Sequence, residues 1–363
     1  MDGKESLRND PFLFSDTRRL WREKNGHDAD RFENSPYLCN SKDSYSVMIN
    51  RTLIRLKIVQ ILYSHFIREN SNAEAAEKEL LFSLSKAYDL YNSMLLLLVE
   101  LTRYAENRIE MRRCRLQPTE EDLNPNMRFV ENAFVRQLAS NAQLAEYAKH
   151  QKHSWSDVEE YVRHLFETIE QSDIYKEYME KPSSSYEEDR ELWRRLYKNV
   201  ISTDEELDNV LENMSLYWND DRGIVDTFVL KTIKRFEQEN GAQQELLPEF
   251  KSEEDRAFAL KLLRKAIAHA DEYQQMIDSH CHNWDKERVA FMDRVIMTVA
   301  LAEIINFPNI PLSVSYDEYV EIAKAYSTPK SAAFVNGVLD AVARDLKKEN
   351  KLMKEEQKAV SSQ

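Results

Sequence analysis

The sequence predicts an all-α protein, and three observations support that prediction. Only 5 glycines and 9 prolines occur among 363 residues, while Leu, Glu, Lys, Ala and Arg dominate. Glycine and proline interrupt helices, whereas the dominant residues favour them. Apolar residues recur at helical spacing along most of the chain after residue 50. Ser, Thr and Asn stand where several of these periodic segments begin, and these residues cap helices.

The first 47 residues break this pattern. Charges of both signs and scattered aromatic residues follow no sustained period in residues 1–47, and proline and Asn-Gly steps interrupt them. We expect a disordered extension there. Met48 is an alternative start of the protein, because helical periodicity sets in abruptly just after it.

Two helices are expected in residues 48–115, which we interpret as an N-terminal helical subdomain. The first runs from Asn50, which can cap it, to Arg68. The second opens with the capping-box spacing Ser71–Glu74 and continues to about residue 115. Its end carries five arginines: Arg103, Arg108, Arg112, Arg113 and Arg115. Cations at a helix C-terminus complement the helix dipole, and contact with RNA or an acidic partner is the alternative.

The first of these helices places two arginines in an apolar arc. Arg51 and Arg55 lie beside Ile58 and Leu62 on a helical wheel. A buried, unpaired arginine is very costly, so one interpretation is that the first turn overhangs the core and presents both arginines outward. The other is that their methylene stems cover the core edge while their head groups pair with carboxylates. A narrow polar strip occupies the opposite face: Lys57, Gln60, Ser64 and Arg68.

Residues 116–284 are interpreted as a helical insertion. Residues 116–126 form an acidic, proline-containing linker. Shorter helical patterns follow at 129–138, 142–148 and 158–169, with a still shorter one to about Met179. After a break at 182–185, further patterns follow at 185–200, 204–213 and 224–236, and Ser185 to Glu188 has capping-box spacing for the first of them. One last helix is expected from Ser252 to about Ile277. Within the insertion, Trp193 and Tyr197 lie among cations, as in single-strand binders, but they share one helical face, which favours packing.

Residues 285–348 predict a compact unit of three helices, followed by a charged tail at 349–363. The first helix, Val289–Ile305, is apolar on nearly every side and is expected at the centre of a bundle. The spacing Ser315–Glu318 predicts a capping box for the second. Thr328 and the proline after it predict the start of the third. Gly337, in the middle of that helix, is expected to permit the close approach of another backbone.

The sequence contains no recognisable catalytic or metal-binding motif. Its glycines are too far apart for a nucleotide-binding turn. His280-Cys281-His282 lacks a second pair of ligands at zinc spacing. Three distant cysteines indicate no disulfide framework and fit a reducing compartment. We therefore expect no enzyme, no cofactor and no metal.

Net charge and hydropathy argue against several further classes of protein. The formal net charge is −14, which argues against nonspecific coating of nucleic acid but leaves room for a local basic patch. No basic-then-apolar signal begins the chain. The longest apolar run, Met94–Val99, is far shorter than the roughly 20 residues of a membrane span. A cytoplasmic protein without membrane contact is expected.

Several motifs in order resemble the NusB transcription antitermination family. They are Ala300–Ile304 at the end of the apolar helix, the turn marked by proline, Tyr316–Lys324, Lys330–Asp340 with its FVNGVLD core, and Met48–Arg68 with Val59–Tyr63. The resemblance implies two small helical bundles set against one another, the N-terminal one expanded here by the insertion. It also implies that the protein binds and does not catalyse.

The resemblance further implies partners and site residues. Family members pair with NusE, a small-subunit ribosomal protein, bind boxA RNA of ribosomal RNA transcripts and help RNA polymerase read through terminators. The carried-over RNA-face residues are Arg51, Arg55, Lys57, Tyr63 and Phe334. For Tyr63 and Phe334, core packing is an equal alternative. Asp293 and the exposed edge of its helix are the expected NusE contact.

This sequence also departs from the family pattern. Neutral residues follow Arg51 where compact members have consecutive arginines, and Lys330 stands where they carry an aspartate. The alternative function is therefore a helical protein–protein scaffold of the same fold without RNA binding of its own. A methyltransferase carrying such a domain would need a glycine-containing cofactor-binding domain, which this sequence lacks. A homodimer is left open.

Overall fold

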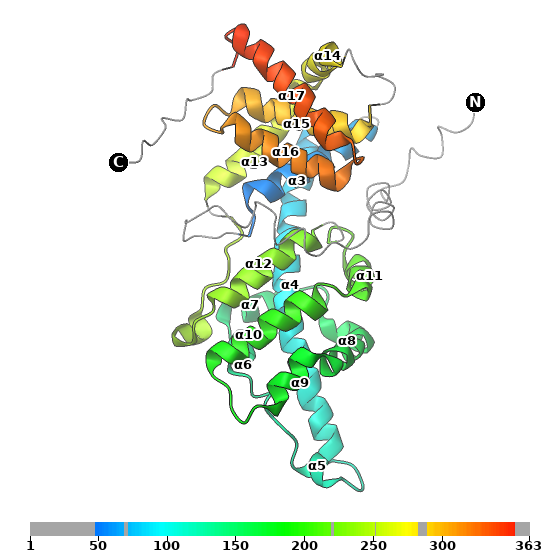
Figure 1. Cartoon of the computed structure of the whole chain (residues 1–363), viewed down its shortest axis with the longest axis vertical. Helices are drawn as coiled ribbons and strands as arrows, with labels where there is room; N and C mark the ends of the chain where they lie inside the picture. The colour runs from blue at the N-terminus through cyan, green and yellow to red at the C-terminus, as the bar shows by residue number, and fades with distance from the viewer. Residues whose placement is uncertain (1–47, 69–71, 219–220, 251, 282–288, 353–363) are drawn as a thin grey trace, which may run out of the picture. The chain divides into compact units, whose positions relative to one another are not determined.

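The structure, a computed structural model, describes residues 48–68, 72–218, 221–250, 252–281 and 289–352. Every secondary-structure element in these ranges is helical, and none is a strand (Figure 1). The all-α prediction is therefore confirmed. The predicted extension 1–47 and most of the predicted tail 349–363 lie outside the described residues.

The described residues fall into two compact units. Unit 1 combines residues 49–84 with the chain from residue 250 onward, and unit 2 contains residues 85–249 together with Met48. The long helix α4 (Ala73–Arg113) begins in unit 1 and continues into unit 2. The subdomain borders expected from the sequence instead follow residues 115 and 284. The two divisions differ because helical periodicity shows that a segment has an apolar face, but not which neighbour covers it.

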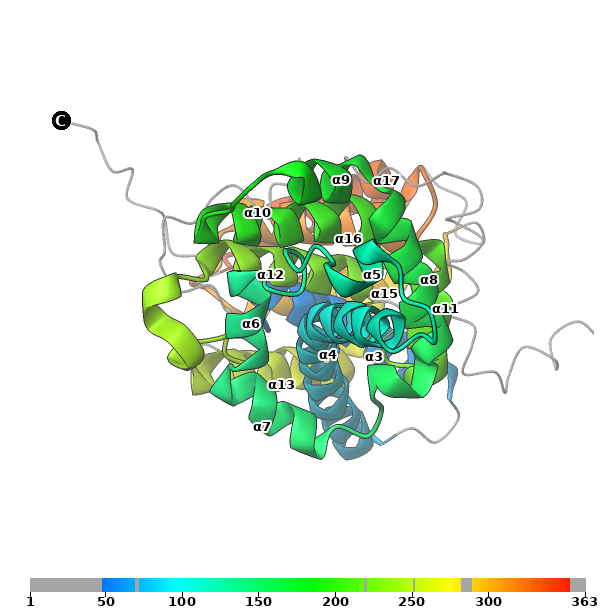
Figure 2. The ribbon, with the colours of Figure 1, turned by 90° about the horizontal axis from the view of Figure 1, so that it is seen from below.

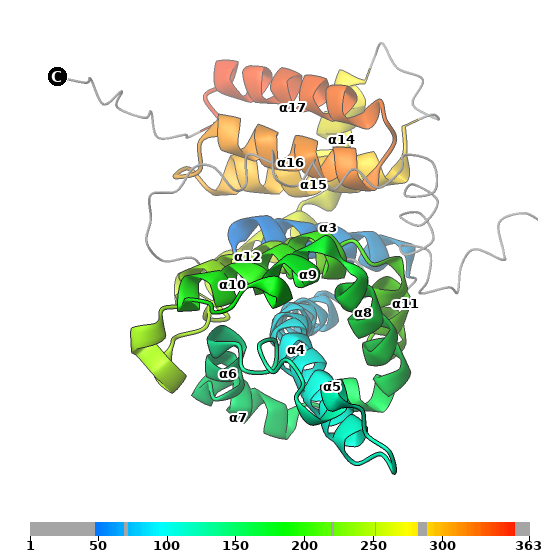
Figure 3. The same cartoon turned by 60° about the horizontal axis from the view of Figure 1, so that its bottom comes forward.

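Unit 1 is organised around one buried helix. Besides the first turns of α4, its helices are α3 (Arg51–Ile67), α13 (Glu253–Ala268), α14 (Ala270–His280), α15 (Phe291–Asn306), α16 (Leu312–Tyr326) and α17 (Ser331–Lys348). Helix α15 contacts α3, α13, α14, α16 and α17. Figure 3 shows α15 between α17 on one side and α3 on the other. Every residue from Met292 to Ile304 except Arg294 is buried, which confirms the predicted central helix.

Two expected helix starts in unit 1 were wrong. Helix α16 begins at Leu312, directly after Pro311, so Ser315 lies inside it and is buried. Helix α17 begins at Ser331 and not at Thr328. The Thr328 N–H donates to the Ser331 hydroxyl oxygen at 3.1 Å. Ser331 therefore supplies the side-chain acceptor that was expected from Thr328. Both serines instead form hydrogen bonds with buried partners elsewhere in the chain, which the local sequence pattern does not reveal.

The helix expected from Ser252 to Ile277 is two helices. Ser252 caps α13 as its first residues suggest, with its hydroxyl oxygen accepting from the Glu254 N–H at 3.2 Å. The backbone leaves the helical region at His269, where φ is −115° and ψ is 21°. Helix α13 packs against α3 and α15, whereas α14 packs against α15 and α17. The break at His269 gives each half its own direction over the central helix.

Unit 2 is built around the second part of α4. Its other helical segments are α5 (Glu120–Leu123), α6 (Ala133–Ala139), α7 (Ala142–His150), η2 (Trp155–Val158), α8 (Glu159–Gln171), α9 (Asp173–Glu180), α10 (Tyr186–Leu196), η3 (Tyr197–Ile201), α11 (Glu205–Met214), α12 (Arg222–Arg235) and η4 (Gln238–Gln243). Figure 2 looks along α4 and shows α6, α7, α8 and α12 around it. The Trp155 indole N–H donates to the Ser93 carbonyl at 2.7 Å, and the Tyr147 hydroxyl donates to the Asp89 carbonyl at 3.0 Å. Side chains of η2 and α7 thereby fasten to the backbone of α4.

In unit 2 the structure confirms the helix cap and the side-chain packing that the local sequence predicts. Ser185 and Glu188 form the predicted capping box at the start of α10. Trp193 and Tyr197 are both fully buried, as the packing interpretation expected. The expected linker also holds the short helix α5, because Thr119 and Asp122 form a second capping box there. At the start of α4, which lies in unit 1, the Asn72 carboxamide oxygen accepts the Glu74 N–H at 2.9 Å, while Ser71 lies outside the described residues.

Gly337 does not mark a close approach of two backbones. It lies on the exposed side of α17, and a Cβ atom added there would meet nothing within 4 Å. The expected close approach was wrong. Glycine in a helix interior costs about 0.5–1 kcal/mol against alanine. We therefore expect Gly337→Ala to raise the free energy of unfolding by about that amount, measured by urea denaturation; a lower free energy would mean that Cβ meets an obstacle.

Candidate nucleic-acid interface

The first turn of α3 carries Arg51 at its surface. Asn50 caps this helix as predicted, with its side-chain oxygen accepting the Leu53 N–H at 2.9 Å. The Arg51 side chain is 40 % exposed, and its Nε lies 3.4 Å from an Asp255 carboxylate oxygen. Its guanidinium carbon lies 4.9 Å from the centre of the Phe258 ring. Arg51 is therefore held over α13 while part of its charge stays open to solvent.

Arg55 points inward, so the expectation that the first turn presents it outward was wrong. Its Nε and Nη2 donate to the two carboxylate oxygens of Glu303 at 2.7 Å and 3.1 Å. Its Nη1 lies 3.4 Å from a Glu318 oxygen. Burial by itself would lower the pKa of Arg55, but the Glu303 carboxylate outweighs that effect and the pKa lies above its ordinary value. The alternative interpretation, pairing with carboxylates, is confirmed for this residue.

Glu303 is the hub of this buried polar cluster. Besides Arg55 it accepts the Ser315 hydroxyl at 2.8 Å and the Tyr319 hydroxyl at 3.2 Å. Burial raises the pKa of Glu318, and the positive charge of Arg55 opposes that rise. The cluster thus joins α3, α15 and α16 through one bidentate ion pair and its hydroxyl donors, a geometry that favours strong charge-assisted hydrogen bonds.

The remaining residues expected at the RNA face from the family resemblance are Lys57, Phe334 and Tyr63. Lys57 is buried and does not form part of an exposed strip. Phe334 is also buried, in agreement with the core-packing alternative. Tyr63 is half-buried, and burial raises the pKa of its hydroxyl. Its ring meets Phe291 edge to face with centroids 5.2 Å apart. Sequence reasoning missed Phe291, whose exposure only the structure reveals.

Asp293 is not on an exposed edge of α15, contrary to the sequence expectation. It is buried, and one of its carboxylate oxygens accepts the Ser331 hydroxyl at 2.8 Å. Burial raises the pKa of Asp293, and the Ser327 and Ser331 hydroxyls counter part of that rise. This contact ties the start of α17 to the first turn of α15. A structural role therefore accounts for the Asp293 carboxylate.

The other sequence candidates have ordinary structural partners. The His280 ring lies 3.1 Å from an Asp345 carboxylate oxygen, and His282 lies outside the described residues. No group of three or more potential metal ligands occurs in the part of the chain that the structure describes. In the arginine cluster at the end of α4, Arg108 pairs with Glu170 and Arg115 with Asp122.

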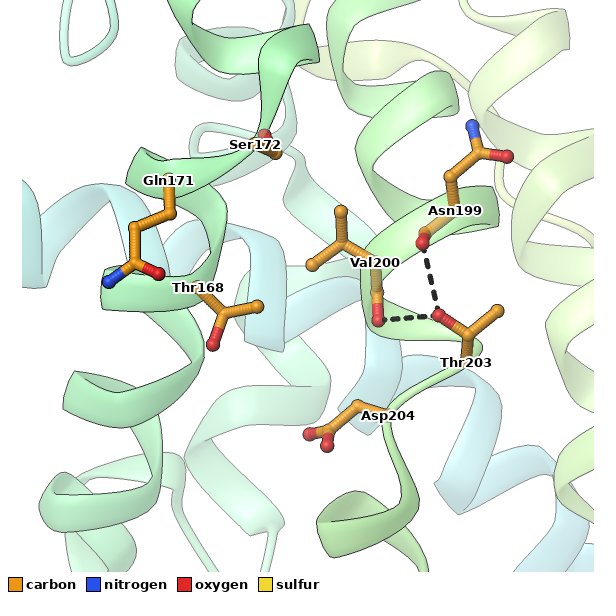
Figure 4. Close-up of a pocket in the computed structure, with 7 residues that line it drawn as sticks. All are labelled: Thr168, Gln171, Ser172, Asn199, Val200, Thr203 and Asp204. Carbon is orange, nitrogen blue, oxygen red and sulfur yellow. Dashed lines mark hydrogen bonds between the residues drawn. The ribbon is translucent and has the colours of Figure 1, made fainter.

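A surface hollow of about 410 Å³ lies between α8, η3 and the start of α11 in unit 2 (Figure 4). It is lined by Thr168, Gln171, Ser172, Asn199, Val200, Thr203 and Asp204. Asp204 is its only ionisable lining residue, and one of its oxygens accepts the Tyr161 hydroxyl at 2.7 Å. The Thr203 hydroxyl donates to backbone carbonyls of its own segment. These internal bonds leave no pair of groups set for acid–base chemistry.

Comparison with known proteins decides the family. The transcription antitermination protein NusB of Salinibacter ruber is 38 % identical over 132 residues, which are 35 % of this chain and 82 % of that protein. The chain belongs to the NusB family. The sequence model of the NusB family matches residues 226–344. NusB of Koribacter versatilis is 43 % identical over 99 residues, covering 27 % of this chain and 68 % of the relative.

The family assignment bears on several predictions. NusB proteins are non-enzymatic antitermination factors, which supports the prediction that this chain is not an enzyme. The family match includes α13 to α16 and most of α17, whereas residues 85–225 of unit 2 lie outside it. No solved structure matches the chain. None of the helices in the described ranges has both the length and the apolar character needed to cross a membrane.

Proposed function

We propose that this NusB-family protein is a cytoplasmic transcription antitermination factor that binds boxA RNA together with NusE. The complex would recognise nascent ribosomal RNA transcripts and promote read-through by RNA polymerase. The observation that carries the proposal is the alignment with 82 % of a protein named transcription antitermination protein NusB. Binding then rests on local positive charge for phosphate and on stacking or hydrogen bonding for unpaired bases.

The proposal divides the carried-over residues into two groups. Arg51 and Tyr63 reach the surface and would contact RNA themselves. Arg55, Lys57 and Phe334 are buried and would support that surface from within. For NusE we retain the first turn of α15 around Asp293 as the proposed contact region, with the carboxylate of Asp293 holding α17 in place.

A scaffold without RNA binding of its own is the second candidate. Two observations favour it: Arg55 is neutralised by buried carboxylates, and Arg51 already has Asp255 as a partner. Both reduce the positive charge that α3 offers to phosphate. In this case the protein would join other proteins through its helical surfaces.

Binding of a boxA oligonucleotide, measured by fluorescence anisotropy with and without NusE, separates the two candidates. RNA binding that appears or tightens with NusE supports the antitermination proposal. Association with NusE but no RNA binding by the pair favours the scaffold. If the protein binds neither NusE nor the boxA oligonucleotide, the antitermination proposal is wrong.

Replacing Arg51 by alanine tests the proposed RNA face. We expect weaker boxA binding by the NusE complex, with the plot of log affinity against log salt shallower by roughly 0.7 for one lost phosphate contact on single-stranded RNA. Arg256→Ala is the matched control, because Arg256 is an exposed arginine on α13 of the same unit. Equal affinity and salt slope for the Arg51 variant and wild type would place the phosphate contacts elsewhere.

A further inference from the structure

Helix α13 changes the sign of its charge after its first turn. Glu253, Glu254 and Asp255 make that turn acidic. Residues 256–270 then contain four lysine and arginine residues and no aspartate or glutamate. This is a local basic stretch in a chain whose formal net charge is −14. Such a stretch attracts a polyanion at close range, whatever the net charge of the whole protein.

Two of these four cations lack a carboxylate partner. Arg264 has one, because its Nε and Nη2 donate to the two carboxylate oxygens of Glu77 at 2.6 Å each. Lys261 is exposed and Lys265 is half-buried, and a spacing of four residues places them on the same face of the helix. Among the residues that the structure describes, no carboxylate oxygen lies within 4.0 Å of either ammonium group. Their charges are therefore not offset by a nearby ion pair.

Two aromatic rings connect Lys261 to Arg51 on α3. The Nζ of Lys261 lies 4.7 Å from the centre of the Phe307 ring. Phe307 meets Phe258 edge to face, with the ring centroids 5.0 Å apart. The guanidinium carbon of Arg51 lies 4.9 Å from the centre of the Phe258 ring. Both rings are buried and attract the cations above them, so Arg51 and Lys261 lie on neighbouring parts of one surface.

The apolar residues at the surface bear on the kind of polyanion that this surface fits. None of the exposed large hydrophobic side chains among the described residues lies on α3 or α13. The centre of a protein–protein interface is apolar and is depleted in charged residues, lysine among them. A basic surface without exposed large hydrophobic side chains therefore fits the sugar–phosphate backbone of RNA better than an acidic protein.

We propose that Lys261 and Lys265 extend the RNA face from Arg51 across α13, each contacting a phosphate of single-stranded RNA. This inference deepens the proposed function and rests on it. A single strand presents a phosphate at every nucleotide, so a row of cations can follow its backbone. Contacts of this kind position the strand without reading its bases. Base recognition then remains with other residues of the complex.

The salt dependence of RNA binding tests this inference. Lys261→Met removes the charge but keeps an apolar side chain over the Phe307 ring. We expect it to weaken boxA binding by the NusE complex and to make the plot of log affinity against log salt shallower by roughly 0.7. Adding Lys265→Met should make that slope shallower by roughly 1.4 in total. Lys261→Arg should keep the wild-type slope, because it keeps the charge.

Arg256→Met is the matched control. Arg256 is also exposed on α13, but at 3.6 residues per turn it lies roughly 140° around the helix from Lys261. We expect this variant to keep the wild-type affinity and salt slope. Circular dichroism melting checks that each variant folds.

The possible outcomes separate the inference from the proposed function. If the wild-type complex binds RNA and the double lysine variant binds it with the same affinity and slope, the inference is wrong and the proposed function stands. If the lysine variants weaken NusE association in the absence of RNA, the surface contacts protein, which also overturns the inference. A wild-type complex without RNA binding overturns both proposals.

Discussion

Replacing Arg55 by alanine is expected to lower the free energy of unfolding by about 3–5 kcal/mol. The guanidinium of Arg55 makes a bidentate contact with Glu303 and lies near Glu318. The Glu303 carboxylate is fully buried, and the Glu318 carboxylate is mostly buried. Alanine leaves these carboxylates without their cation in a place where water cannot replace it. The penalty comes from the uncompensated buried charge and exceeds the net value of the ion pair itself.

Urea denaturation followed by circular dichroism measures this effect, and two further variants define its origin. Arg51→Ala, one turn away on the same helix, should cost less than about 1 kcal/mol because its ion pair is partly exposed. Combining Arg55→Met with Glu303→Gln should cost less than the sum of the two single changes, because the pair is removed together. A loss below about 1 kcal/mol for Arg55→Ala would mean that the cluster does not stabilise the fold.

The stability of the Arg55→Ala variant should also depend more steeply on pH than that of the wild type. Burial already raises the pKa of Glu318 above its ordinary value, and Arg55 opposes that rise. A carboxyl group with a raised pKa in the folded state binds its proton more tightly there, so stability falls as pH rises past its unfolded pKa of about 4.3. Without Arg55 the pKa of Glu318 rises further. The difference in stability from wild type should therefore be smallest at acidic pH and largest at neutral pH.

Replacing Trp193 by alanine is expected to lower the free energy of unfolding by about 3–5 kcal/mol as well. Trp193 is fully buried in unit 2, and its ring centre lies 5.2 Å from that of Phe129. Alanine would leave a large cavity among aromatic neighbours that are already fixed. Among the residues that the structure describes, the indole N–H finds no hydrogen-bond partner, so removing that group alone should cost little stability.

Trp193→Phe is therefore the matched variant, and we expect it to lose much less stability than Trp193→Ala in the same denaturation experiment. It should bind boxA RNA in the NusE complex like wild type, because the ring has no face open to a base. Loss of RNA affinity in a fully folded Trp193→Phe variant would contradict the packing role. Equal stability of the alanine variant and wild type would contradict the assigned burial.

The sequence alone determined those features that depend on neighbours along the chain. Helix formation follows from propensity and from apolar spacing, and capping follows from side chains that reach a backbone N–H a few residues away. Asn50 and Ser185 cap the helices expected of them. The central position of α15 was predictable because nearly all of its sides are apolar.

Only the tertiary structure decided how polar residues on those helices are used. The same apolar arc allowed Arg55 to face solvent or to enter the core, and the choice depended on Glu303, which lies 248 residues away. Ser315 became a donor to that carboxylate instead of a cap. Asp293 was buried beneath α17, whereas Gly337 and Phe291 were left exposed. A local pattern records the side chain but not its distant partner, and the free energy of a buried charge or an exposed ring depends on that partner.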